Sequence, residues 1–240
     1  MLQAEDLSTL LPELYARSGD FTTMFARTAG LDGHKVVTVD LLDPQAPLPA
    51  PEAFAGVFIS GSAAMVTDRA PWMLRAEAWI RDAARTDVPT LGICFGHQLI
   101  ASALGGDVAD APQHAYETVT VTLTDAGLAD QLLSVLPPKA PLQSAHSQIV
   151  TRLPSDAPPL AHADTGIYAA RFAGNLWGVQ FHPETCAEDM SIIIEDVRTA
   201  LEAGGIDADA KIAGIKPSPD GPALMRRFRD IALGALPTGA

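Results

Sequence analysis

The 240-residue sequence has two cysteines, few basic residues and no long hydrophobic run, and each shortage excludes a class of protein. Cys94 and Cys186 are too few for a disulfide framework, so we expect a reducing, cytoplasmic setting. Sixteen Lys and Arg against 29 Asp and Glu give a net charge of −13, which disfavours nucleic acids and anionic membranes as partners. Since no apolar run reaches the length of a membrane span and MLQAEDLSTL lacks a signal-peptide pattern, we expect neither feature.

The composition is that of a folded protein. Hydrophobic residues make up 48% and charged residues 19%, and the length suits one large domain or two small ones. We expect residues 1–203 to form the main domain. Residues 204–220 are rich in Gly, Pro and Asp and predict a loop, and a closing helix over 223–233 is expected to pack on the same domain, which would place 204–240 with it.

Short apolar segments alternate with segments of helical periodicity, which predicts an α/β fold with a mostly parallel central sheet. Strands are expected at 35–40, 54–60, 90–93 and 176–181, and helices at 20–29, from Pro71, from Gln98 to Leu104 and at 187–203. Residues 117–124 (ETVTVTLT) alternate with period two, which predicts a half-exposed antiparallel strand, and further short strands are expected at 149–153 and 166–172.

The segment after the 90–93 strand has the spacing of a nucleophile elbow, with cysteine in place of serine. Cys94 is flanked at two residues on either side by Gly92 and Gly96. Glycine suits these positions because the sharp turn is strained and neighbouring chain passes close by. A helix N-terminus favours the thiolate, and the N–H of Phe95 is placed to serve an oxyanion hole. The alternative is a buried cysteine in an ordinary strand-loop-helix turn.

A cysteine nucleophile needs a base and a group that orients the base, and His182-Pro183-Glu184 supplies both residue types. Pro183 restricts its own backbone and that of the residue before it, so the two side chains can project to one side. Cys94 and His182 each follow a predicted strand, where open α/β sheets place their sites. An isolated His-Pro-Glu is more typical of a loop; together with the elbow it favours a Cys-His-Glu triad.

On these residues the sequence resembles the class I (triad-type) glutamine amidotransferases, most closely the glutaminase domain of GMP synthetases and its free-standing relatives. Three motifs carry the resemblance, in the family's order and over residues 20 to 200. They are residues 59–62 (ISGS), residues 92–98 (GICFGHQ) with 104–106 (LGG), and residues 178–184 (GVQFHPE).

The resemblance implies a flavodoxin-like three-layer fold with helices on both faces of the sheet, and a small antiparallel excursion. It implies no metal and no cofactor. It also implies the roles of the site residues: catalysis by Cys94, His182 and Glu184, an oxyanion hole from Gly61 and Phe95, and substrate binding by Gln98, His146 and Ser147. The last two lie in a segment, 144–148, that we expect to be a loop, and Gln148 stands there where the family has Asp.

Three functions remain open. The first is a glutaminase that releases ammonia for a separate synthase, because the chain has neither a Walker-type loop nor a Ser-Gly-Gly-x-Asp-Ser motif. The second is a free-standing γ-glutamyl hydrolase or peptidase, which passes through the same thioester. A binding module that keeps the fold is the third, and a complete Cys94, His182 and Glu184 set argues against it.

Overall fold

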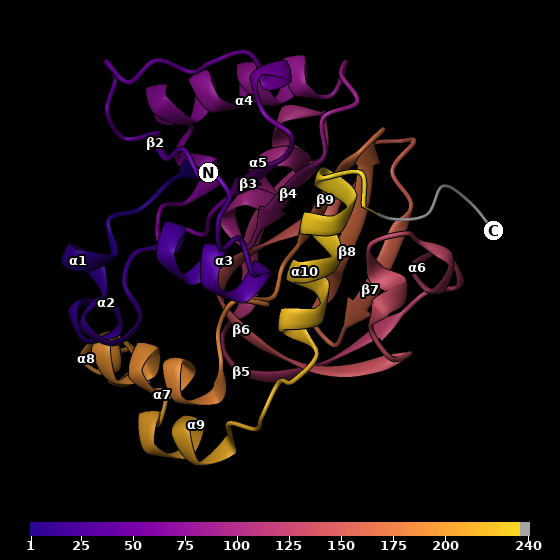
Figure 1. The fold of residues 1–240 in the computed structure, drawn as a ribbon. Coiled ribbons are helices and arrows are strands. Elements are labelled where there is room, and N and C mark those ends of the chain that lie inside the picture. The colour runs from indigo at the N-terminus through magenta and orange to yellow at the C-terminus, as the bar shows by residue number, and fades with distance from the viewer. Residues whose placement is uncertain (236–240) are drawn as a thin grey trace.

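A nine-stranded mixed sheet runs through the centre of the computed structural model, which describes residues 1–235 (Figure 1). The spatial order of the strands is β2-β1-β3-β4-β9-β8-β7-β5-β6. Their bounds are β1 Leu2–Gln3, β2 Val39–Asp40, β3 Val57–Ile59, β4 Thr90–Ile93, β5 Asp107–Leu123, β6 Lys139–Arg152, β7 Pro159–Ala163, β8 Gly166–Ala173 and β9 Leu176–Val179.

The sheet has a parallel half and an antiparallel half. Strands β2, β1, β3, β4 and β9 are parallel to their neighbours, and from β9 onward β8, β7, β5 and β6 pair antiparallel. The predicted α/β sheet is confirmed, and so is the antiparallel strand over residues 117–124, which lies inside β5. The antiparallel part is larger than the small excursion we expected.

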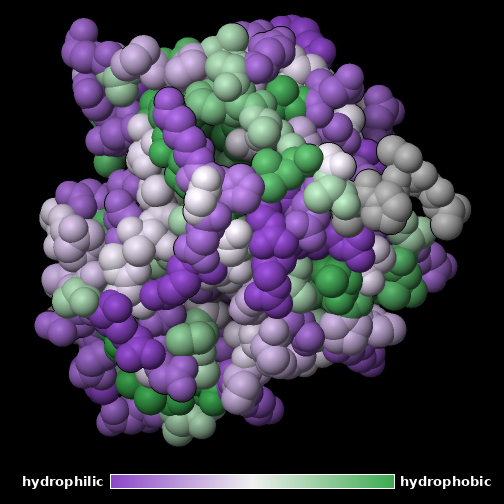
Figure 2. Space-filling model, viewed as in Figure 1, coloured by the Kyte–Doolittle hydropathy of each residue, from purple (hydrophilic) through white to green (hydrophobic). Residues whose placement is uncertain are grey.

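Helices cover both faces of the sheet. They are α1 Leu7–Leu10, α2 Pro12–Ser18, α3 Phe21–Ala29, α4 Pro71–Ala83, α5 Phe95–Ala103, α6 Asp125–Ala129, α7 Ala187–Asp196, α8 Arg198–Ala203, α9 Ala208–Gly214 and α10 Gly221–Ala232. One buried cluster joins the sheet to α4 and α5, and a second joins the other face to α3, α7 and α10. Within residues 1–235 no helix is long and apolar enough to cross a membrane. The face in Figure 2 is mostly hydrophilic, with separate hydrophobic patches.

The predicted strand over residues 35–40 is wrong for its first four residues. Only Val39–Asp40 pairs, as the edge strand β2, and Val36 and Val37 are exposed. The cause lies in the partner: β1 has just two residues, Leu2 and Gln3, and each pairs with one residue of β2. A β-branched run cannot extend a ladder beyond the backbone groups that its neighbour offers.

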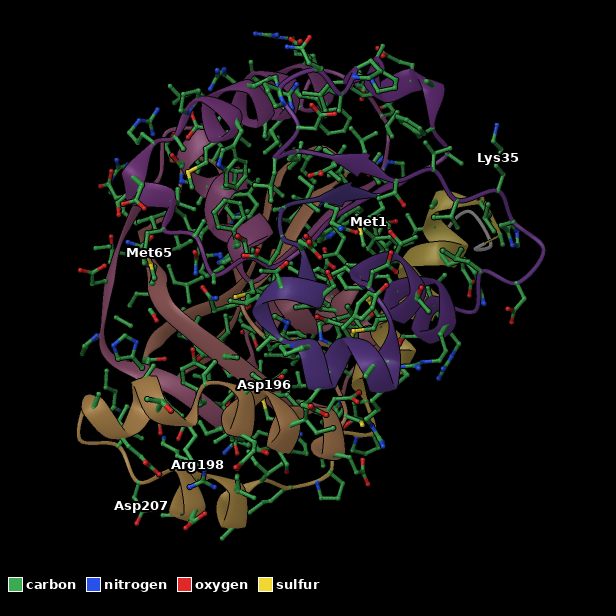
Figure 3. The ribbon with its side chains drawn as sticks, turned by 90° about the vertical axis from the view of Figure 1, so that its left-hand side faces the viewer. Met1, Lys35, Met65, Asp196, Arg198 and Asp207 are labelled. Atoms are coloured by element: carbon green, nitrogen blue, oxygen red, sulfur yellow. The ribbon has the colours of Figure 1, made fainter. Side chains whose placement is uncertain are left out.

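Two expectations near the C-terminus are corrected. The helix predicted over 187–203 is broken at Val197 into α7 and α8, and the predicted loop 204–220 contains α9. Asp207 caps α9 by accepting a hydrogen bond from the N–H of Ala210. Arg198 at the start of α8 forms ion pairs that include Asp209 of α9, at 2.8 Å. Figure 3 labels Arg198 and the capping residue Asp207. The polar composition that predicted a loop is that of a short, capped and ion-paired surface helix.

The segment 144–148 is a strand and not the expected loop. It lies within β6 and pairs with β5, with Ser144 opposite Glu117 and His146 opposite Ala115. Its polar side chains are buried in the sheet: Ser144 is 0% exposed, His146 5% and Gln148 2%. Polar composition usually indicates an exposed loop. It does not do so here, because these side chains have hydrogen-bond partners inside the protein.

Candidate active site

Three parallel strands end side by side at one edge of the sheet. The pairing aligns Ile59 of β3 with Gly92 of β4, and Ile93 of β4 with Val179 of β9. Gly61, Cys94 and His182 therefore emerge next to one another, just beyond the carboxyl ends of the strands. This is the edge at which open α/β sheets place their ligands.

Cys94 occupies a strained turn between β4 and α5. Its backbone has φ 52° and ψ −103°, a conformation that side-chain-bearing residues rarely adopt. A Cβ added to Gly92 would lie 2.5 Å from the backbone of Gly96, and one added to Gly96 would lie 2.6 Å from the Ile59 carbonyl oxygen. Both glycines of the elbow are thus required by close backbone approach, as the sequence predicts.

We expect a Cys94→Gly variant to be more stable than Cys94→Ala, the reverse of the usual order. Both lack the thiol, but only glycine adopts a positive φ without a steric penalty. The difference in unfolding free energy should be about 1 kcal/mol in favour of glycine. Urea unfolding of the two variants measures it. An alanine variant as stable as the glycine variant would show that the turn stores no strain.

His182 and Glu184 form a buried hydrogen-bonded pair beside the thiol. The Nδ1–Oε1 distance is 2.7 Å, and the Glu184 side chain is fully buried. Burial acts to lower the pKa of His182, but the Glu184 carboxylate and Cys94 outweigh it and raise that pKa well above its usual value. Cys94 and His182 border the same hollow, so the imidazole lies beside the sulfur. The triad predicted from the sequence is therefore brought together in a geometry suited to nucleophilic catalysis.

Two further groups hold the Cys94 sulfur, and sequence reasoning assigned neither a role. The thiol donates to the Ala145 carbonyl oxygen at 3.4 Å, and the Gln180 amide donates to Sγ at 3.6 Å. Gln180 also accepts a hydrogen bond from the Gln98 amide, at 3.1 Å. Gln180 lies inside the quoted 178–184 motif, where its position two residues before His182 was the available signal.

The two expected oxyanion-hole residues lie on either side of the elbow. Phe95 is the first residue of α5, so its N–H has no partner within the helix. Gly61 follows β3; a Cβ there would lie 3.1 Å from the His182 ring and 3.9 Å from Cys94 Cβ. The Gly61 carbonyl accepts from the Ser60 hydroxyl at 2.9 Å, which orients the adjoining backbone. Glycine at residue 61 keeps the space beside His182 and Cys94 free of a side chain.

A polar hollow of about 150 Å³ opens at Cys94 and contains all three of the expected substrate-binding residues. Besides Cys94 its lining includes Gln98, Tyr116, His146, Ser147 and Gln148. Tyr116 was not predicted, because its place beside Cys94 depends on the pairing of β5 with β6. The hollow is small, and polar side chains reach it from α5, β5 and β6.

His146 is a neutral imidazole at the floor of this hollow. Burial, helped by the positive charge of His182, lowers its pKa to about 4. Nε2 lies 3.0 Å from the Tyr168 hydroxyl, while Nδ1 is buried with no partner in the described part of the chain. Ser147 bonds to His114 at 2.6 Å. Both His146 and Ser147 therefore line the hollow, as predicted. His146 Nδ1 is a buried polar atom without a hydrogen-bond partner among the described residues.

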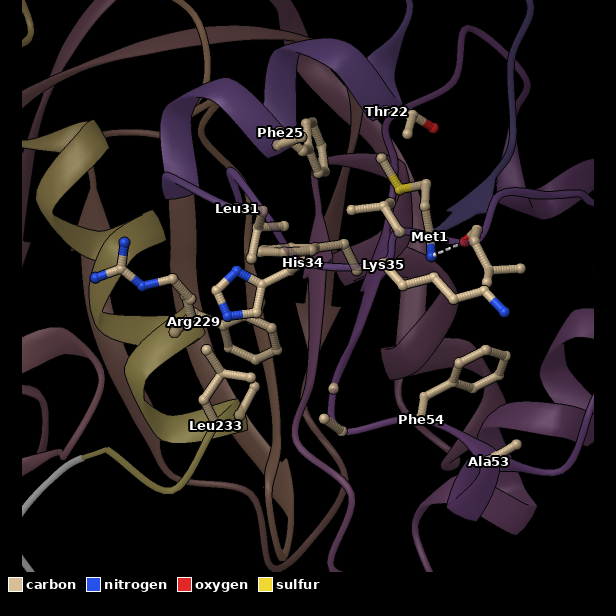
Figure 4. A pocket seen from close by; sticks show the side chains of 18 residues that line it. Met1, Thr22, Phe25, Leu31, His34, Lys35, Ala53, Phe54, Arg229 and Leu233 are labelled. Atoms are coloured by element: carbon tan, nitrogen blue, oxygen red, sulfur yellow. Dashed lines mark hydrogen bonds between the residues drawn. The ribbon is translucent and has the colours of Figure 1, made fainter.

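Another hollow, of about 370 Å³, lies away from the triad (Figure 4). Phe25, His34, Phe54 and Arg229 are among its lining residues. It also borders Gly56, which precedes β3, and so lies at the amino end of that strand. Since Cys94 follows the carboxyl end of β4, this hollow does not lead to the nucleophile. In residues 1–235 no three His, Cys, Asp or Glu side chains are grouped to hold a metal ion.

Comparison with known proteins agrees with this geometry. Residues 19–196 match the family described as glutamine amidotransferase class-I. The chain is 35% identical over 169 residues to one subunit of the glutamine-hydrolyzing GMP synthase of Halobacterium salinarum, covering 69% of this chain and 84% of that one. It is 34% identical over 131 residues to the glutamine-hydrolyzing GMP synthase of Aeropyrum pernix, covering 54% of this chain and only 24% of that protein.

Solved structures share the fold. A glutamine amidotransferase from Thermotoga maritima superposes with a TM-score of 0.72 at 17% identity, covering 97% of this chain and 96% of that one. One from Methylobacillus flagellatus gives 0.69 at 20% identity, covering 100% and 95%. The family match spans the elbow, the triad and the strands that place them, and so the chain belongs to the class I glutamine amidotransferases.

Proposed function

We propose that Cys94, His182 and Glu184 are the catalytic residues of this glutamine amidotransferase. The observation that carries the proposal is the buried His182–Glu184 pair, with its 2.7 Å hydrogen bond, next to a cysteine on a strained elbow. A structural cysteine would need neither the strained backbone nor a charged partner. The polar hollow on one side of Cys94 supplies a binding site for the substrate.

In the first half of the reaction the Cys94 thiolate attacks the side-chain amide carbon of glutamine. The N–H groups of Gly61 and Phe95 stabilise the oxyanion of the tetrahedral intermediate. The C–N bond then breaks, the His182 imidazolium gives its proton to the leaving nitrogen, and ammonia departs. Glu184 keeps Nδ1 protonated, so that Nε2 faces the reacting atoms.

In the second half water hydrolyses the γ-glutamyl thioester. His182, now neutral, accepts a proton from water, hydroxide adds to the thioester carbon, and glutamate and the Cys94 thiolate are released. The polar hollow holds the α-amino and α-carboxyl groups of the substrate throughout. His146 and Ser147 are the proposed binding residues, and Gln98 positions the wall through its bonds to Gln148 O, at 2.7 Å, and Gln180 Oε1, at 3.1 Å.

We propose that the ammonia is used by a separate synthase. Two observations support this. The match to a relative named as one subunit of GMP synthase covers 84% of that Halobacterium protein. The chain itself carries no Walker-type phosphate loop. The acceptor of the ammonia is set by that partner.

The test is ammonia release from glutamine by the purified chain alone, with Cys94→Ser as the control. Release by the parent and none by the variant is the expected result, because the triad is already assembled without a partner. Equal release by both proteins would refute the cysteine mechanism. No release by the parent would contradict the proposal that the isolated chain holds a working site.

A further inference from the structure

Cys94 also borders a second hollow, of about 110 Å³, whose lining is more apolar than that of the first. Its lining is mainly apolar and comes largely from α1, α2, α3 and α7, including Leu7, Leu10, Leu11, Leu14, Phe21, Met24 and Ile193. His182 and Glu184 line this apolar hollow, and neither lines the polar one. The sulfur thus lies between a polar compartment and an apolar compartment.

The position of the imidazole decides which part of a substrate enters each compartment. The general acid must reach the leaving nitrogen, and the apolar hollow is the one that His182 lines. The glutamyl part then occupies the polar side, where Gln98, His146 and Ser147 lie. Ammonia needs no hydrocarbon surface, so an apolar hollow on the leaving-group side has room for an amine that carries a hydrocarbon substituent.

The segment that forms much of this apolar wall lies outside the region of family similarity. The family match begins at residue 19, and α1 and α2 span residues 7–18. Of these two helices, α2 is fixed to α7 through Asp189, whose Oδ1 accepts from Arg17 at 3.0 Å and from Ser18 at 2.9 Å. Leu7 and Leu14 are buried, whereas Leu10 is 36% exposed at the mouth. The wall is a fixed part of this fold.

We propose that the apolar hollow is a leaving-group subsite, and that the enzyme also hydrolyses γ-glutamyl amides of small apolar amines. The inference rests on the proposed function, since it uses the same nucleophile and acid. Cys94 Sγ bonds to the carbonyl carbon of the γ-glutamyl amide, and the C–N bond to the amine breaks. The leaving amine takes the proton of His182, and water then hydrolyses the thioester to glutamate and regenerates the thiolate.

The experiment measures kcat/KM for glutamine and for γ-glutamyl amides of methylamine, ethylamine, propylamine and butylamine. These amines have nearly equal basicity, so differences among them report contacts with the hollow. We expect kcat/KM to rise about fourfold for each added methylene until the hollow is filled. γ-Glutamylglycine, with a carboxylate in the same place, should fall about tenfold below the propylamide, because that carboxylate would be desolvated among apolar side chains and would face the carboxylates of Glu5 and Glu184, which also line the hollow.

Leu10→Asp tests the wall at its exposed mouth, where the substitution does not disturb the buried core. The ratio of kcat/KM for the butylamide to that for the methylamide should fall about tenfold. Leu74→Asp is the matched control, since Leu74 on α4 is 42% exposed and lines neither hollow, and it should leave that ratio unchanged. Cys94→Ser should abolish all of these activities.

The results separate the two proposals. Cys94-dependent hydrolysis of glutamine with a flat or falling series of alkylamides would refute the apolar subsite and leave the glutaminase proposal standing. An equal fall of the ratio in Leu10→Asp and Leu74→Asp would also refute the subsite. Absence of hydrolysis of glutamine and of every amide would refute both.

Discussion

Replacing His182 with alanine is expected to lower kcat/KM for glutamine about 10⁴-fold, whereas Glu184→Gln should lower it about 10³-fold. The alanine variant has no group to protonate the leaving nitrogen. The glutamine variant keeps the imidazole but loses the carboxylate that holds Nδ1 protonated at 2.7 Å and raises the pKa of His182. The first change removes the acid and the second misorients it.

Ammonia release under saturating and limiting glutamine gives kcat and kcat/KM for both variants. The pH profile separates them further: in Glu184→Gln the limb of the rate that depends on protonated His182 should move to lower pH, because its pKa is no longer raised by the carboxylate. Urea unfolding controls for loss of fold. Equal activity in the two variants would contradict the proposed division of roles.

Acidification from pH 7 to pH 5 is expected to remove about 4 kcal/mol of stability through two buried histidines. Burial lowers the pKa of His97 to about 3 and that of His146 to about 4, against 6.5 in the unfolded chain. Below pH 6.5 the unfolded state therefore binds protons that the folded state excludes. The stability that these two neutral histidines contribute is present above pH 6.5 and is lost as the pH falls below it. At pH 5 each histidine accounts for a loss of about 2 kcal/mol.

Urea unfolding at pH 7, 6 and 5 measures this loss. A His146→Gln variant cannot bind the proton, so the drop between pH 7 and pH 5 should be about 2 kcal/mol smaller than in the parent. His162→Gln is the matched control, because His162 is exposed on β7, and it should reproduce the parental drop. A parent and a His146→Gln variant with equal drops would show that His146 is protonated in the folded state.

The parallel half of the sheet and the placement of Cys94 beside His182 and Glu184 could be predicted from the sequence because their signals are local. Gly92 and Gly96 mark the elbow by spacing alone, and the structure shows that a Cβ at either would meet neighbouring backbone. His182 and Glu184 are two residues apart and follow a buried strand. Because β4 and β9 are parallel neighbours, their carboxyl ends lie side by side. The sequence therefore also predicts that Cys94 and His182 lie together.

The hollow lined by His146 and Gln148 could not be predicted in the same way, because long-range strand pairing builds it. Residues 144–148 have the composition of a loop, but pairing with β5 buries them. The same pairing brings Tyr116 to Cys94 from a segment with no catalytic motif. The strand predicted over residues 35–40 is too long for a related reason. The length of β2 is set by its partner β1, and not by its own β-branched residues.

Support for the imidazole reaches well past the last residue of family similarity, which is residue 196. The N–H of His182 donates to the Gln143 carbonyl at 2.8 Å, and the Gln143 side chain donates to Lys216 O at 2.8 Å and to Ser218 Oγ at 3.2 Å. Phe228 of α10 packs on Phe58 of β3, with ring centroids 4.6 Å apart. A chain trimmed to its homologous segment would therefore lack part of the scaffold on which its chemistry depends. The smallest segment expected to keep this scaffold is longer than residues 19–196, the part of the chain that matches the family description.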